Sequence, residues 1–158
     1  MSYSPPNSDN WQGRKTEPAK GKQYWYQHVE LLGISELSEG QPPDFGIVGY
    51  VCDEGVRRNQ GRVGAKDGPK VIRQKSGKMA LHTIKRIADF GDVVCEDETM
   101  EACQDELSGV VSKLIKAGTF PIVLGGGHDI AYGHFKGIKE AAGGRRVGII
   151  NFDAHFDL

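Results

Sequence analysis

Apolar residues follow two different spacings along this chain, and the spacing changes from one segment to the next. Residues 42–53, 86–94, 119–127 and 145–155 contain short apolar runs, such as PIVL and VGII, that are typical of buried strands. Residues 97–118 follow a helical pattern instead: apolar side chains from Met100 to Ile115 recur at three- and four-residue steps, and Gly118 ends the helix. Residues 69–81 and 128–142 also read as helices, with Pro69 suited to a first turn.

Strands that alternate with helices imply parallel pairing through right-handed crossovers. The pattern therefore predicts a doubly wound α/β domain over residues 41–158. Residues 1–40 are polar at first and rich in Pro, Ser and Lys, and we expect an N-terminal arm that is partly flexible. Its aromatic trio Tyr24, Trp25 and Tyr26 is expected to pack on the domain or on a neighbouring subunit.

Composition narrows the class of protein. The chain has 158 residues, 38% of them hydrophobic, and a formal charge of −1 from 20 basic and 21 acidic residues. Nothing here indicates binding to nucleic acid or to an acidic membrane, and no apolar run approaches the ~18 residues of a membrane span. The first residues lack the apolar core of a secretory signal, and the three cysteines are odd in number and widely spaced. We expect a cytoplasmic protein with free thiols.

Two polar segments follow strands of the predicted sheet: LGGGHD at 124–129 and NFDAHFDL at 151–158. Ligands of open α/β sheets bind at the carboxyl ends of strands. If the two strands are neighbours, about 4.8 Å apart, His128 lies beside Asp153 and His155, with Asp157 completing the cluster. Asp129 is expected instead to cap the helix that it begins.

Imidazole and carboxylate ligands without thiolate suit Mn²⁺, Zn²⁺ or Fe²⁺, and carboxylate-rich sites favour Mn²⁺. Asp153 and Asp157 would lie about 13 Å apart in an extended strand, so the segment must curl or serve two ions. Paired ions would also generate a nucleophile at neutral pH. A phosphate-binding loop is the weaker alternative, because GGGHDIAYG has Ile130 where the dinucleotide-binding pattern needs glycine.

The motifs LGGGHD and NFDAHFDL, together with NQGRVGAKDGPKVIR, resemble the ureohydrolase family of arginases, agmatinases and formimidoylglutamases. The resemblance runs from about Asp44 to Leu158 and implies an arginase-like three-layer sandwich. GGGHD followed by AYGHF is most similar to formimidoylglutamase, which implies hydrolysis of N-formimidoyl-L-glutamate to L-glutamate and formamide in histidine degradation. An arginase- or agmatinase-type enzyme that releases urea is the alternative within the family.

The resemblance also implies a site with two Mn²⁺ ions and an enzyme that forms a homo-oligomer at full length. His128 and Asp157 would hold one ion, His155 the other, and Asp153 would bridge them. Catalytic roles would fall to His155 and to Asp157, which would accept a hydrogen bond from a bridging hydroxide.

The family has a later strand with two further aspartates, and this sequence has no such motif after Leu158. We therefore expect the first half of a longer enzyme, which by itself has an exposed sheet edge, weak metal binding and little activity. A non-catalytic module that binds metal or nucleotide is the alternative from another class.

Overall fold

The computed structural model describes residues 2–38, 40–96 and 99–155. Its centre is a sheet in which β3 (Phe45–Val51) lies between β4 (Ile87–Val94) and β5 (Phe120–Leu124). All three strands are parallel, and Phe45 lies opposite both Ile87 and Phe120. The short strands β1 (Ser2–Ser4) and β2 (Glu30–Leu31) pair with β4, the first antiparallel and the second parallel. The predicted parallel α/β sheet is confirmed for β3, β4 and β5.

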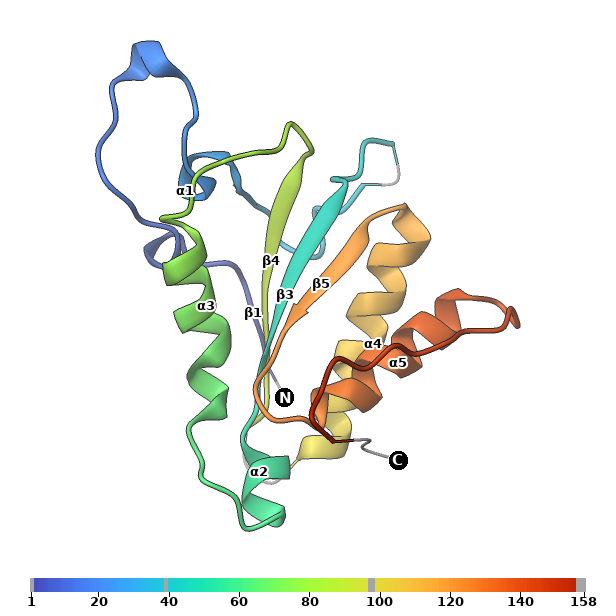
Figure 1. Cartoon of the computed structure of the whole chain (residues 1–158). Helices are drawn as coiled ribbons and strands as arrows, with labels where there is room; N and C mark the ends of the chain where they lie inside the picture. Colours follow the sequence, from blue (N-terminus) through green and yellow to red (C-terminus); the bar gives the residue numbers. More distant parts are fainter. Residues whose placement is uncertain (1, 39, 97–98, 156–158) are drawn as a thin grey trace.

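Helices cover both faces of the sheet, as the alternating pattern predicts (Figure 1). Helix α3 (Gly68–Ser76) lies on one face, and α4 (Met100–Ala117) and α5 (Ile130–Ala141) lie on the other. The described residues also form the shorter helices α1 (Trp25–His28) and α2 (Glu54–Arg58), and 3-10 turns at Ser8–Asn10, Pro18–Lys20 and Ala65–Asp67. No helix of the described part of the chain combines the length and the apolar character needed to cross a membrane.

The main core lies between the sheet and α4. The α4 side chains Leu107, Val111 and Leu114 are fully buried, and they pack with strand residues such as Val48 and Phe90. This is the apolar stripe that the three- and four-residue spacing predicts. Burying one such side chain contributes roughly 1.5–3 kcal/mol, so α4 anchors this face of the sheet.

The start of the N-terminal arm packs on the sheet. Ser2–Ser4 forms a strand on β4, and Trp11 is only 6% exposed. The indole N–H of Trp11 donates a hydrogen bond of 2.7 Å to Asp89 Oδ2 in β4. Trp25 and Tyr26 pack against the buried cluster of Trp11, Ile47 and Ile87. The boundary between arm and domain near residue 40 stays a prediction.

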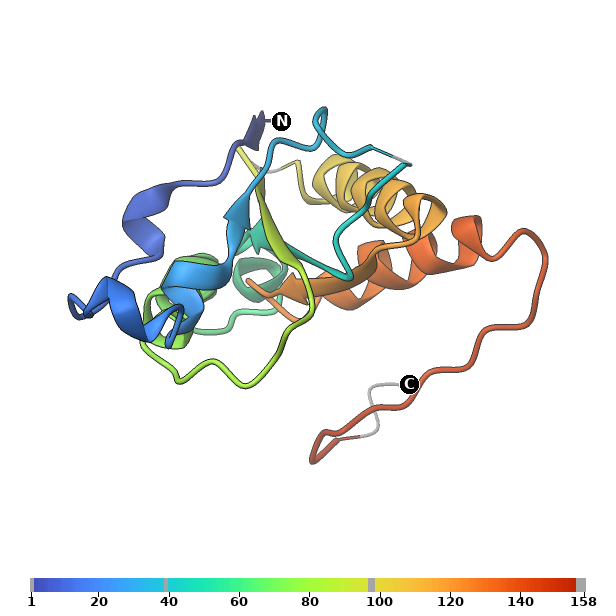
Figure 2. The same cartoon turned by 90° about the horizontal axis from the view of Figure 1, so that it is seen from above.

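The strand predicted over 145–155 is wrong for this structure. After α5 the chain turns at Gly143 and Gly144, which have positive φ, and runs back past α5 without regular structure. Ile149, Ile150 and Phe152 are 72%, 82% and 96% exposed. Figure 2 shows this segment standing apart from the sheet. An apolar run forms a strand only against a sheet edge, and here no described strand pairs with it.

Candidate metal centre

His128 lies on the loop that joins β5 to α5, at the carboxyl edge of the sheet. The N–H of Gly127 donates to the carbonyl oxygen of Cys52 at 3.1 Å, so the loop is fixed to the end of β3. A Cβ atom at Gly126 would lie 2.4 Å from that same oxygen. Only glycine permits this approach, and the loop thereby presents His128 to solvent.

Asp129 does not cap α5 with its side chain, which corrects the sequence-based expectation. Its Oδ2 atom instead accepts a hydrogen bond of 2.7 Å from the hydroxyl of Tyr50, and its carbonyl oxygen accepts one from Gln104. Its Oδ1 atom is buried and has no hydrogen-bond partner in the described part of the chain. Burial, together with this carboxylate, raises the pKa of Tyr50, which therefore stays a hydrogen-bond donor.

The other predicted ligands lie on the segment that follows α5. Asp153 Oδ1 accepts a hydrogen bond of 2.9 Å from the backbone N–H of His155 and lies 3.3 Å from His155 Nδ1. The side chain of His155 is 83% exposed. The hydrogen bond from the His155 backbone is the main reason that the pKa of Asp153 is lowered. Asp153 is therefore a carboxylate at neutral pH.

The two halves of the predicted site are close enough to interact but are not assembled. His128 adds a smaller electrostatic contribution that also lowers the pKa of Asp153. Within residues 2–38, 40–96 and 99–155, no three His, Cys, Asp or Glu side chains are close enough to hold one ion. Strand β5, which precedes His128, does not pair with residues 147–150. The prediction that these two segments are neighbouring strands is therefore wrong. Asp157 lies outside the described residues.

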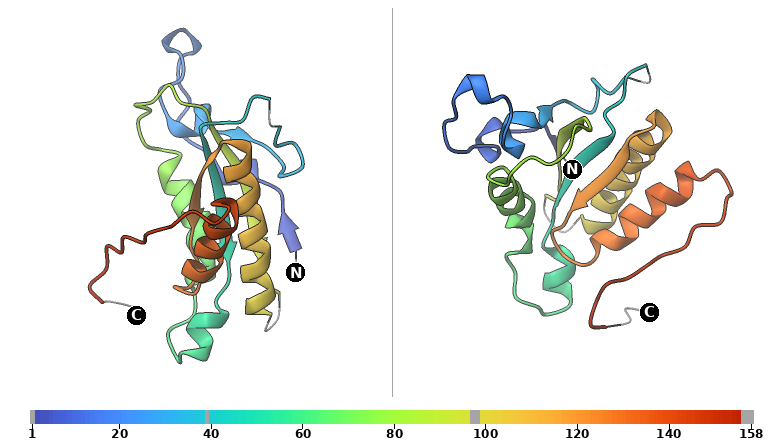
Figure 3. Two further views of the ribbon diagram at one scale, coloured as in Figure 1. Left: turned by 90° about the vertical axis from the view of Figure 1, so that its right-hand side faces the viewer. Right: turned by 45° about the horizontal axis from the view of Figure 1, so that its top comes forward.

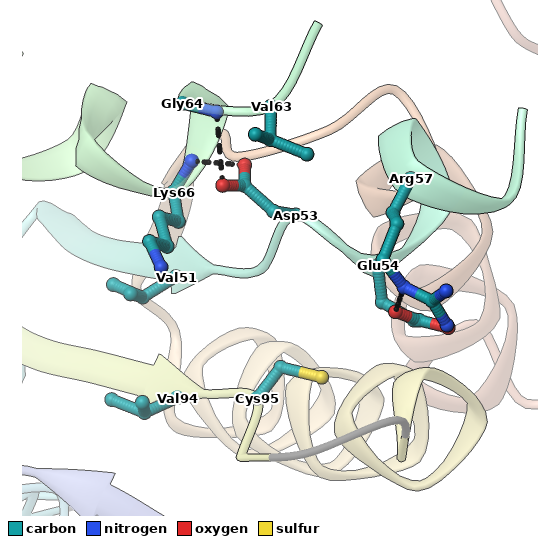
Figure 4. Close-up of a pocket in the computed structure, with 9 residues that line it drawn as sticks. All are labelled: Val51, Asp53, Glu54, Arg57, Val63, Gly64, Lys66, Val94 and Cys95. Atoms are coloured by element: carbon teal, nitrogen blue, oxygen red, sulfur yellow. Dashed lines mark hydrogen bonds and ion pairs between the residues drawn. The ribbon is translucent and has the colours of Figure 1, made fainter. Parts of the chain in front are cut away.

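A pocket at the carboxyl ends of β3 and β4 is a second feature of this edge, and the sequence did not predict it (Figure 4). We call it the strand-end pocket, and its volume is about 690 Å³. It is lined by Val51, Asp53, Glu54, Arg57, Val63, Gly64, Lys66, Val94 and Cys95. The glycine- and arginine-rich run after β3 was the available signal, but a loop pattern alone does not show that a cavity forms.

Comparison with known proteins decides the family. Residues 43–158 match the arginase family. The chain belongs to the arginase family. It is 46% identical over 150 residues to formimidoylglutamase of Chromobacterium violaceum, covering 94% of this chain and 47% of that protein. It is 43% identical to formimidoylglutamase of Geobacillus kaustophilus, covering 99% of this chain and 50% of that one.

Solved structures give the same fold for this arginase-family chain. A variant of formiminoglutamase from Trypanosoma cruzi with Mn²⁺ matches with a TM-score of 0.58 and 30% identity, over 63% of this chain and 36% of that one. The oxidised enzyme with Mn²⁺ at pH 6.0 matches with a TM-score of 0.56 and 28% identity, over 70% and 42% of the two chains. The arginase-like α/β fold is thereby confirmed. The chain spans about half the length of the curated relatives it matches.

Proposed function

We propose that this chain carries part of the active site of a manganese-dependent hydrolase that converts N-formimidoyl-L-glutamate and water into L-glutamate and formamide. The observation that carries the proposal is the 46% identity to a formimidoylglutamase over 94% of the chain. The GGGHD and DAHFD motifs lie inside the residues that match the arginase family.

The donor set fits divalent manganese. His128, Asp153, His155 and Asp157 would hold the ions, because imidazole and carboxylate without thiolate is the ligand chemistry that manganese accepts. Asp153 is ionised without a metal, and the exposed ring of His155 is open to a ligand. When bound, two manganese ions would acidify water into a nucleophile at neutral pH and offset the charge of the two carboxylates. Mn²⁺ in the related T. cruzi structures supports this choice of metal.

The residues of the chain itself would position the reaction. The glycines before His128 hold the loop against β3, and the Tyr50 hydroxyl fixes Asp129 beside it. In the hydrolysis, water adds to the amidine carbon, and the bond from that carbon to the glutamate nitrogen breaks. The nitrogen leaves with a proton as the amine of L-glutamate, and the carbon leaves as formamide.

Other properties belong to the same proposal. We infer an enzyme of the cytoplasm that acts on a small molecule, forms a homo-oligomer at full length, and neither binds nucleic acid nor inserts into membranes. The near-neutral charge of the chain supports the inference about nucleic acid.

The experiment that tests the proposal is product analysis. The full-length protein that contains this chain is loaded with Mn²⁺ and incubated with N-formimidoyl-L-glutamate, and formamide is measured by NMR. L-arginine and agmatine are tested in parallel for release of urea. We expect formamide and no urea. Urea from a guanidino substrate, with no formamide, would assign the chain to the other branch of the family.

A further inference from the structure

The strand-end pocket holds two acidic side chains whose charges are already satisfied. The two oxygens of Asp53 accept backbone N–H groups of Gly64 and Lys66 at 3.0 and 2.7 Å. Glu54, only 8% exposed, accepts hydrogen bonds of 2.7 Å from Arg57 and Arg58. Hydrogen bonds from these two arginines lower the pKa of Glu54 to about 2. Neither acid therefore forms an ion pair with Lys66, the other cationic residue of the pocket.

That cation is the ammonium group of Lys66. In the described part of the chain it forms no ion pair with a carboxylate. Figure 4 shows the Lys66 side chain running along one wall, with its ammonium group directed toward Val51, while Arg57 and Glu54 stand on the opposite side. An ammonium group without a carboxylate partner, at the wall of a cavity, is a natural binding group for an anion.

The rest of the lining suits a short aliphatic chain that ends in a carboxylate. Val51, Val63 and Val94 supply apolar contact surface. Burial raises the pKa of Cys95 to about 11, so its thiol is neutral at pH 7 and does not repel an anion. An ammonium group beside apolar contact surface matches the side chain of glutamate better than it matches a chain that ends in an amine.

The pocket adjoins the loop that carries His128. A Cβ atom at Gly68, two residues after Lys66, would lie 2.5 Å from the carbonyl oxygen of Gly125. On the other side, a Cβ atom at Gly55 would lie 2.4 Å from Asp129 Oδ1. The segments on both sides of the pocket thus contact the β5–α5 loop. A ligand anchored at Lys66 would therefore lie beside segments that contact the loop of His128.

We propose that the strand-end pocket is the subsite for a carboxylate of the acidic amidine substrate, and that Lys66 is its anion-binding residue. This inference rests on the proposed function and deepens it. Lys66 would attract a substrate with an anionic tail and repel one with a cationic tail, such as agmatine. It would thereby determine specificity within the family.

The test measures binding rather than turnover. L-glutamate, which shares both carboxylates with the substrate, is titrated into the ¹⁵N-labelled chain, and the amide signals of Gly64 and Lys66 are followed. Agmatine serves as the cationic probe. The variant Lys66→Met removes the charge, and Lys70→Met, on an exposed position of α3 outside the pocket, is the matched control.

We expect L-glutamate to shift the signals of Gly64 and Lys66, and agmatine to leave them in place. Lys66→Met should weaken L-glutamate binding about tenfold or more, the value of one hydrogen bond to a charged group, while Lys70→Met should not change it. If the full-length protein releases formamide but Lys66→Met binds L-glutamate as tightly as the wild type, the subsite is overturned and the proposed reaction stands. Binding that depends on Lys66 without formamide release overturns the proposed reaction and supports the anion site.

Discussion

Asp153 is the carboxylate on which the proposed metal site depends most. Its pKa is lowered chiefly by the backbone N–H group of His155, and a smaller electrostatic effect of His128 acts in the same direction. A lowered pKa means that the carboxylate persists at neutral and mildly acidic pH. Asp153 can therefore accept a cation without first releasing a proton.

Replacing Asp153 by Asn removes this charge and should weaken Mn²⁺ binding at least about tenfold. The measurement is a titration of Mn²⁺ followed by the EPR signal of the free ion. Asp105→Asn is the control, because Asp105 is an exposed acid that pairs with Lys136 on the outer side of α4 and α5. Equal Mn²⁺ affinity of the Asp153 variant and the wild type would refute its assignment as a ligand.

Glu54 gives an expectation for pH dependence. Its pKa is lowered to about 2 by hydrogen bonds from Arg57 and Arg58. A lowered pKa in the folded state stabilises the fold above the ordinary value of about 4.3, and this contribution is lost as the pH falls toward 2. In an NMR titration, the chemical shift of the Glu54 side-chain carboxyl carbon should still be that of the ionised form at pH 3. A midpoint near 4 would show that the arginines do not hold it.

Individual residues show where sequence reasoning stopped. Asp129 begins a helix, which is the usual position of a capping residue, yet it binds Tyr50, which is 79 positions away in the sequence. The position of a residue on a helix is visible in a sequence, but a partner brought close by the fold is not. The prediction that Cys52, Cys95 and Cys103 are thiols outside any disulfide, in contrast, agrees with the structure.

Between elements, the hydrogen bond from Tyr50 to Asp129 joins the end of β3 to the start of α5. Tyr50→Phe would remove the donor and leave the buried carboxylate without it, which should cost about 1–3 kcal/mol of the free energy of unfolding. Urea denaturation measures this cost. Tyr132→Phe, at a tyrosine that is 58% exposed, is the control and should change stability by less than about 0.5 kcal/mol. Equal stability of the two variants would contradict the role given to Tyr50.

Helix α3 is fixed to β4 by a buried cation. The Arg73 side chain is 1% exposed and contacts Asp89 at 2.8 Å and Asp92 at 2.6 Å. Arg73→Met would leave Asp89 buried without its cation, which should cost about 3–5 kcal/mol. Lys75→Met, at an exposed position of the same helix, is the control for thermal unfolding. A loss below about 1 kcal/mol would show that other contacts hold α3 in place.

Elements with a long regular pattern were predicted well, and short or unpaired ones were not. The apolar runs gave β3, β4 and β5, and the periodic segment gave α4. Helix α2 was missed because its five residues include Gly55 and carry no apolar stripe. Ion pairs from Glu54 to Arg57 and Arg58, at three- and four-residue spacing, stabilise this helix in place of apolar packing. The strand over 145–155 was wrong because an apolar run does not reveal whether a sheet edge will receive it.

For the whole molecule, the carboxyl edge of the sheet collects the features that matter for the proposed function. The His128 loop and the strand-end pocket lie along it, and the segment with Asp153 and His155 returns toward the start of α5 (Figures 1 and 3). The sequence predicted this edge from the order of strands and helices. It also predicted an exposed sheet edge, and within the described residues this edge is β5 rather than residues 145–155, with Phe120 64% exposed.

The central claim is that His128 and the segment with Asp153 and His155 bind the same metal ions. Mn²⁺ broadens NMR signals of nearby nuclei, so substoichiometric Mn²⁺ added to the ¹⁵N-labelled chain maps the site directly. We expect the amide signals of His128, Asp153 and His155 to broaden together, and those of Lys75 on α3 to stay sharp. Broadening at only one of the two segments, or at neither, would contradict the claim.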